Sequence, residues 1–196
     1  MFSRPDETDD FAFYAKDRFV EHLDAVALET VHSHIPPRVK PAKVVGVGLD
    51  AKELSQDQSL NEWLIHDLNR DPRLSFPKCS FDAVLNTVSV DYMTRPLEVF
   101  REVGRVLRPR GLFLVVFSNR MFPQKVIKLW RQSSEEERVI YVEELFGYAL
   151  CFGEIRTFLS KGRTRPPEDK YASLQQPCNF NGVNVGFRRG ALDMRP

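Results

Sequence analysis

The fold is decided by the stretch "FDAVLNTVSVDYMTRPLEVFREVGRVLRPRGLFLVVFS", residues 81–118. It opens with a short apolar run, continues with apolar residues at three- and four-residue steps, and closes with a longer apolar run. These patterns indicate a strand, an amphipathic helix and a second strand, with Pro109 and Gly111 marking the end of the helix. The predicted strand, helix and strand cover residues 82–86, 96–107 and 112–118. Such an order is typical of parallel sheets.

The same alternation extends to both sides of this stretch. Upstream, "AKVVGVGL" predicts a strand at 43–48, "NEWLIHDL" predicts one at 63–66, and residues 16–31 have the spacing of an amphipathic helix. Downstream, residues 122–149 predict one or two helices, with Ser133 or Ser134 as a cap. The predicted fold class is therefore α/β and Rossmann-like, with a mostly parallel sheet and helices on both faces.

Composition limits the class of protein. The chain has 196 residues, of which 42% are hydrophobic and 28% charged, with a net charge of +1. We expect no nucleic-acid partner and no membrane span, because neither a strong positive field nor an apolar run of about 18 residues is present. Three scattered cysteines favour free thiols in a reducing compartment, so we expect a soluble intracellular protein of cytoplasm or plastid.

Three segments are predicted along the chain. Residues 1–15 are expected to form a loosely held N-terminal arm, and residues 16–159 to form the main domain. Residues 160–196 are rich in Pro, Gly, Asn and Arg, so we expect an irregular or disordered tail with at most a short strand near "GVNVGF".

The central stretch carries a family resemblance. Residues 76–120, "FPKCSFDAVLNTVSVDYMTRPLEVFREVGRVLRPRGLFLVVFSNR", resemble class I S-adenosylmethionine (SAM)-dependent methyltransferases of the type-11 group, which includes the ubiquinone/menaquinone C-methyltransferases. Arg110 departs from the pattern, where the family usually has glycine. The stretches "HDLNRDPRLSFP" and "FSNRMFPQKVIKLW" resemble a plant or cyanobacterial branch. The shared features are Phe76, Pro77, Ser80, Phe81, Asp82, Glu102, Arg105, Leu107, Pro109 and Gly111.

The resemblance also indicates a gap. Residues 43–54, "KVVGVGLDAKEL", resemble the family's second strand and the start of the following helix, not its first strand. The family's first strand ends in a small-residue turn whose backbone amides approach the methionine part of SAM. The chain passes directly from the helix ending at Val31 to "HSHIPP", which resembles the segment after that turn. About fifteen to twenty residues are therefore expected to be missing between Val31 and His32.

The resemblance implies SAM as cofactor and a set of candidate site residues at the ends of the strands. Asp67 and Leu68 match the adenine side, and Asp50 is a displaced candidate for the ribose acid. Turn formation by Asp67 and helix capping by Asp50 are the competing interpretations. The remaining candidates follow the next two strands: Asn86 and Thr87 for the donor, and Ser89, Asn119 and Arg120 on the substrate side.

Other chemistry receives less support from the sequence. For Asn119 and Arg120, a turn with a surface salt bridge is an equally good interpretation. His32 and His34 lack further ligands at suitable spacing, so no metal site is predicted. No catalytic base is legible, since methyl transfer depends mainly on alignment of the nucleophile and the methyl group.

Two functions of different classes remain open. The first is a SAM-dependent methyltransferase-like protein that acts on a small molecule, with weakened or lost donor binding. The second is a non-catalytic remnant of a truncated or alternatively spliced methyltransferase, acting as a scaffold or inactive. A third, an NAD(P)-binding Rossmann protein, would need a complete Gly-x-Gly-x-x-Gly after the first strand, and "GVG" at residues 46–48 lacks the third glycine.

Overall fold

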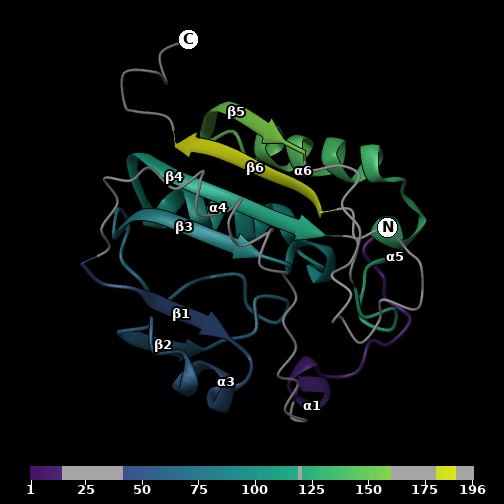
Figure 1. The fold of residues 1–196 in the computed structure, drawn as a ribbon, viewed down its shortest axis with the longest axis horizontal. Helices are drawn as coiled ribbons and strands as arrows, with labels where there is room; N and C mark the ends of the chain where they lie inside the picture. Colours follow the sequence, from purple (N-terminus) through teal and green to yellow (C-terminus); the bar gives the residue numbers. More distant parts are fainter. Residues whose placement is uncertain (15–41, 119–120, 160–179, 189–196) are drawn as a thin grey trace, which may run out of the picture.

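The computed structural model describes residues 1–14, 42–118, 121–159 and 180–188, and Figure 1 shows their arrangement. The helix expected at 16–31 lies outside these residues. The elements in chain order are α1 (Asp10–Tyr14), β1 (Val45–Gly48), α3 (Ala51–Gln56), β2 (Glu62–Ile65), β3 (Phe81–Thr87), the 3-10 turn η1 (Val90–Tyr92), α4 (Pro96–Val106), β4 (Leu107–Ser118), α5 (Lys128–Gln132), α6 (Glu135–Ala149), β5 (Phe152–Phe158) and β6 (Phe180–Arg188).

The predicted parallel strands are confirmed. β1 pairs with β2 in parallel, and β3 pairs with β4 in parallel, with Val84 opposite Phe113. Helix α4 covers Pro96–Val106, close to the prediction, and α6 begins with a capping box in which Ser134 and Glu137 bond each other's backbone amides. The β strands at the end of the chain differ from the expectation, because β6 is antiparallel to both β4 and β5.

Strand β6 corrects the expected irregular tail for the residues that the structure describes there. It runs over Phe180–Arg188, longer than the short strand allowed near "GVNVGF", and lies inside the four-stranded sheet in the order β3-β4-β6-β5. Its glycines and asparagines give no strand signal, but pairing on both sides satisfies its backbone hydrogen bonds. The four-stranded sheet is therefore mixed.

The strands form two sheets. The β1–β2 pair is separate from β3-β4-β6-β5, and β1 is not hydrogen-bonded to β3. Figure 1 shows the arrows of β1, β3 and β4 pointing the same way, with the β1–β2 pair set apart below β3. The carboxyl ends of the parallel strands therefore lie on one side of the molecule, while the hydrogen-bonded sheet is interrupted between β1 and β3.

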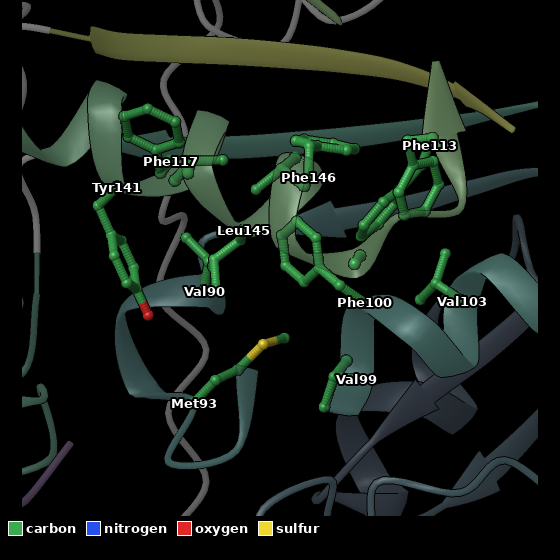
Figure 2. Close-up of a cluster of buried hydrophobic side chains, with 14 of the residues drawn as sticks. Val90, Met93, Val99, Phe100, Val103, Phe113, Phe117, Tyr141, Leu145 and Phe146 are labelled. Atoms are coloured by element: carbon green, nitrogen blue, oxygen red, sulfur yellow. The ribbon is translucent and has the colours of Figure 1, made fainter. Parts of the chain in front are cut away.

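The main core lies between the four-stranded sheet and the pair of helices α4 and α6. Figure 2 shows Phe100 of α4, Phe113 of β4 and Phe146 of α6 gathered together, and all three are fully buried. Their ring centroids are 5.0–5.3 Å apart, mostly edge to face, which is a favourable geometry for aromatic pairs. This packing fixes the β3–α4–β4 unit that the sequence predicted.

Two charged residues of the family-like stretch hold a loop against α4. Glu102 Oε1 accepts a hydrogen bond from the Leu74 amide at 2.8 Å. Arg105 Nη2 donates to the carbonyls of Leu74 and Phe76 at 3.0 and 2.8 Å, and it also pairs with Glu102. These contacts give the Glu and Arg of the motif a structural role, because they fix the segment that leads into β3.

The first fourteen residues are not a loose arm. The Ser3 carbonyl accepts a hydrogen bond from the Lys128 amide at 2.8 Å, and the Asp6 amide donates to the Gln124 carbonyl at 2.9 Å. Asp10, the first residue of α1, is 4% exposed. The expectation of a loosely held arm is wrong for residues 1–14, because these contacts with a distant part of the chain leave no trace in local sequence patterns.

Candidate functional site

The predicted site lies at the carboxyl ends of the parallel strands, where open α/β sheets bind their ligands. Gly48 of β1 is paired with Ile65 of β2, and the His66 amide donates to the Gly48 carbonyl at 2.9 Å. Asp50 and Asp67 therefore each stand two residues beyond a matched pair. Because adjacent strands are about 4.8 Å apart, the segments that carry the two acids leave the sheet at neighbouring points.

Asp50 caps helix α3. Its Oδ1 accepts hydrogen bonds from the amides of Lys52 and Glu53 at 2.8 and 3.2 Å. These bonds satisfy two of the free amides at the helix start, which is the structural interpretation that the sequence left open. Within the described part of the chain Oδ2 accepts no hydrogen bond, so the cap leaves one carboxylate oxygen available.

Asp67 forms a turn with its own backbone. Its Oδ1 accepts from the Asn69 amide at 2.8 Å, and its carbonyl accepts from the amides of Arg70 and Asp71. The neighbouring Leu68 packs against the main hydrophobic core. The expected turn is present, and the role of Asp67 and Leu68 as ligand contacts stays a prediction.

The two candidates at the end of β3 lie on opposite faces of the sheet. Asn86 is paired with Val115 and shares the face of Val84, which packs against the core beneath α4 and α6. Thr87 lies on the other face and is exposed, because side chains alternate along a strand. The buried Oδ1 of Asn86 has no hydrogen-bond partner in the described chain. The structure therefore does not bring these two side chains together.

The substrate-side candidates are only partly described. Ser89 precedes η1 and makes no side-chain capping bond there. Asn119 and Arg120 lie outside the described residues, as do His32 and His34. Among the residues that are described, no group of three His, Cys, Asp or Glu could hold a metal ion. In the described part of the chain, no helix is long and apolar enough to cross a membrane.

Asn69 lies beside the candidate site, and the sequence did not single it out. Its Oδ1 accepts from the Thr94 amide at 2.7 Å, and its Nδ2 donates to the Tyr92 carbonyl at 3.0 Å. It thereby joins the Asp67 turn to the turn after β3. Nδ2 also donates to Asp10 at 2.9 Å. An asparagine inside "HDLN" is common in turns, so only the tertiary contacts reveal this role.

A second feature that the sequence missed is the buried carboxyl of Asp91. This side chain is 2% exposed, and neither carboxylate oxygen has a hydrogen-bond partner in the described chain. Burial raises the pKa of Asp91 to about 7, and the positive charge of Arg138 opposes that rise. Figure 2 shows Tyr141 near Val90, which precedes Asp91, and near Met93, which lies two residues after it; the Tyr141 hydroxyl also has no hydrogen-bond partner among the described residues.

The residues fit part of the implied cofactor. Two acids, Asp50 and Asp67, follow the paired ends of β1 and β2, and each keeps one carboxylate oxygen free of hydrogen bonds from the described chain. Such an oxygen on Asp50 suits the hydroxyls of a ribose, and Asp67 is the candidate on the adenine side. For the charged amino-acid end of SAM, the described residues offer no strand and turn between β1 and β3.

Comparisons with known proteins agree with the resemblance. A family model described as "Methyltransferase domain" matches residues 30–115, which run from before β1 into β4. Over this part the chain has the Rossmann-like fold of class I methyltransferases, and the match supports the type-11 group. No curated protein sequence matches the chain.

Solved structures with a similar course of the chain include three proteins of low identity. The PH0226 protein of Pyrococcus horikoshii OT3 is 21% identical, with a TM-score of 0.48, over 75% of this chain and 72% of that one. The YcgJ protein of Bacillus subtilis is 16% identical, with a TM-score of 0.48, over 76% and 83%. A SAM-dependent methyltransferase of Methanosarcina mazei is 15% identical, with a TM-score of 0.44, over 75% and 82%.

Proposed function

We propose that this chain is a SAM-dependent methyltransferase-like protein of the plant or cyanobacterial branch, built for a small-molecule acceptor, whose donor site is incomplete. The family match over residues 30–115 supports the methyltransferase part. The paired acids Asp50 and Asp67 support a ribose and adenine site at the edge of β1 and β2.

The observation that carries the incomplete site is the interruption between β1 and β3. Each of these strands is paired on one side only within the described chain, in the orders β1-β2 and β3-β4-β6-β5. In a doubly wound sheet the ligand crevice forms where the strand order reverses, and its walls are the turns that follow adjacent strands. A missing strand between Val31 and His32 would leave this interruption and remove one wall.

When bound, SAM supplies an electrophilic methyl group on a sulfonium that leaves readily. The residues of this chain then have to hold and align it. Asp50 would bind the ribose hydroxyls through Oδ2 and Asp67 would contact the adenine side, while Oδ1 of Asp50 caps α3 and Oδ1 of Asp67 holds its turn. Alignment of the acceptor against the methyl group supplies much of the rate in such reactions.

Calorimetric titration with SAM tests this proposal. Hydrogen bonds to charged groups contribute about 1.5–3 kcal/mol each. Losing two of them from the amino-acid end weakens binding by roughly two to four orders of magnitude, at about 1.4 kcal/mol per tenfold. We expect millimolar binding or weaker for the chain as it stands. Insertion of a Val-Leu-Asp-Leu strand and a small-residue turn between Val31 and His32 should strengthen binding by a factor in the same range.

The variant Asp67→Ala is the matched control. Low-micromolar binding by the unaltered chain that Asp67→Ala abolishes would show that the donor site is complete, and the proposal of a missing strand would then be wrong. If the inserted strand and turn leave binding as weak as before in a folded protein, the second candidate is favoured. That candidate is a non-catalytic scaffold, and the same interruption of the sheet supports it.

A further inference from the structure

The N-terminal segment, residues 1–14, meets the candidate donor site through one buried acid. Asp10 accepts two hydrogen bonds from Arg4 Nη1, at 2.9 and 2.8 Å. It also lies 3.2 Å from Lys125 Nζ, and its Oδ2 accepts from Asn69 at 2.9 Å. The side chain of Asp10 thus joins three parts of the chain that are far apart in sequence. Burial would raise the pKa of Asp10, but the hydrogen bonds from Arg4 and Asn69, the charge of Arg4 and the contact with Lys125 hold it below its ordinary value.

Lys125 anchors the same network from the segment that follows β4. Its side chain is fully buried, and Nζ donates to the Thr8 carbonyl at 2.7 Å. It lies 5.1 Å from the centre of the Phe13 ring, a distance at which a cation is attracted to the ring face. A buried ammonium needs such partners, because an unpaired charge inside a protein is strongly unfavourable. The N-terminal segment is therefore held in place by charge as well as by packing.

Asn69 connects Asp10 to the candidate site by hydrogen bonds. Its amide nitrogen Nδ2 bonds both Asp10 and the Tyr92 carbonyl, and its backbone amide bonds Asp67 Oδ1. Its Oδ1 accepts from the Thr94 amide. The polar atoms of the Asn69 side chain are thus engaged on both sides, with the turn after β3 and with α1. Rotation of this side chain would break contacts with both at once.

We propose that Asp10 is a positioning residue of the donor site, which acts through Asn69 to fix the Asp67 turn against the turn after β3. This inference rests on the proposed function for the statement that the Asp67 turn binds SAM. It assigns the N-terminal segment to the wall of the site instead of to a separate arm. An effect on donor binding is then expected from residue 10, although Asp10 is not one of the candidate donor contacts.

Hydrogen exchange of individual amides tests the restraint. In Asp10→Ala, exchange of the Asn69 and Thr94 amides should become at least about tenfold faster, the effect of losing one hydrogen bond to a charged group. Exchange in β4 should stay unchanged. The matched control is Glu7→Gln, at a side chain that is 58% exposed and lies 3.7 Å from Arg4 Nε. Glutamine keeps a side-chain oxygen for the Arg4 backbone amide, and an exposed ion pair contributes little, so the hydrogen bonds from Arg4 to Asp10 stay in place. The exchange pattern of Glu7→Gln should equal that of the unaltered chain.

Two results would overturn the inference. The first is that the Asn69 and Thr94 amides of folded Asp10→Ala exchange at the same rate as in the unaltered chain. The second is that exchange becomes faster by the same factor at these amides and throughout β4, which would indicate that Asp10 contributes to overall stability alone. If Asp10→Ala does not fold, Asp10→Asn takes its place. It keeps an acceptor oxygen for Asn69 but loses the charge, so about threefold faster exchange at the same two amides is expected.

A parallel titration with SAM up to millimolar concentration separates this inference from the proposed function. If Asp10→Ala binds SAM about threefold to tenfold more weakly and Glu7→Gln binds it as the unaltered chain does, the positioning role of Asp10 and the proposed function are both supported. If exchange becomes faster only at Asn69 and Thr94 and the unaltered chain does not bind SAM, Asp10 still positions the Asp67 turn. The non-catalytic candidate function is then favoured. SAM binding that is equal in all three proteins rejects the role of Asp10 at the donor site.

Discussion

The buried carboxyl of Asp91 should make the stability of this protein depend on pH, and Asp91→Asn should remove that dependence. In the folded chain the pKa of Asp91 is raised from 3.8 to about 7 by burial. Because the folded pKa is the higher one, the folded state holds an extra proton between these values. The protonated carboxyl of Asp91 therefore contributes to the free energy of unfolding. This contribution is fully present below pH 3.8 and is lost as the pH rises through about 7.

The magnitude follows from the size of this rise. One pH unit corresponds to about 1.4 kcal/mol, so the ionised carboxyl costs roughly 4 kcal/mol above pH 7 relative to its protonated form. Between pH 5 and pH 8 the free energy of unfolding of the unaltered chain, minus that of Asp91→Asn, should fall by about 2–3 kcal/mol. The difference isolates this one group, because the amide of asparagine does not titrate and the other acids are common to both proteins.

Urea unfolding at pH 5, 6, 7 and 8 measures this difference, with the fluorescence of the fully buried Trp130 as the signal. Tyr141→Phe is the matched control, since it removes a buried hydroxyl that has no hydrogen-bond partner in the described parts of the chain, and it leaves the carboxyl of Asp91 in place. It should keep the pH dependence of the unaltered chain. A difference between the unaltered chain and Asp91→Asn that stays constant over this range, or grows with pH, would refute the reasoning.

Two further substitutions test the backbone and the core. Arg110 has a φ of 65°, a backbone conformation that glycine adopts more readily than other residues, so Arg110→Gly should raise the free energy of unfolding by about 1 kcal/mol. The control Arg108→Gly should lower it, because Arg108 Nη1 donates to both carboxylate oxygens of Asp82. A Cβ at Gly186 would lie 2.3 Å from a ring atom of buried Phe146, so Gly186→Ala should cost roughly 1–3 kcal/mol. Gly147→Ala, in open space on α6, should be neutral or stabilising by up to about 1 kcal/mol. Urea unfolding at one pH checks all four, and a stabilised Gly186→Ala or a destabilised Arg110→Gly would contradict these expectations.

The elements of the centre of the chain could be predicted because their signals are local. The helix expected at 96–107 is observed as Pro96–Val106, and the strand expected at 82–86 as Phe81–Thr87. Both have strong apolar patterns, which depend on the geometry of one segment only. The length of strand β6 was underestimated because its signal is not local. Pairing with β4 and β5 keeps this segment extended, and its own composition does not predict a strand.

The candidate site was predicted only in part. The sequence placed Asp50 and Asp67 after adjacent strands, and the matched pair Gly48 and Ile65 confirms that placement. It grouped Asn86 with Thr87, which the alternation of side chains along β3 separates. It also gave no sign of Asp91, because a single acid in a polar stretch looks the same in sequence whether it is exposed or buried.

The sequence by itself therefore determined the strands and helices in the centre of the chain, the parallel direction of those strands, and the resemblance of the protein to a methyltransferase. The tertiary structure alone decided that β6 lies between β4 and β5, and that Asp10 and Lys125 lie together with Asn69 although 59 residues separate Asp10 from Asn69. Local patterns record the preference of each segment for helix or strand. The pairing of strands and of buried charges depends on free energy gained only when distant segments meet, and a single sequence carries no period or spacing that reports it.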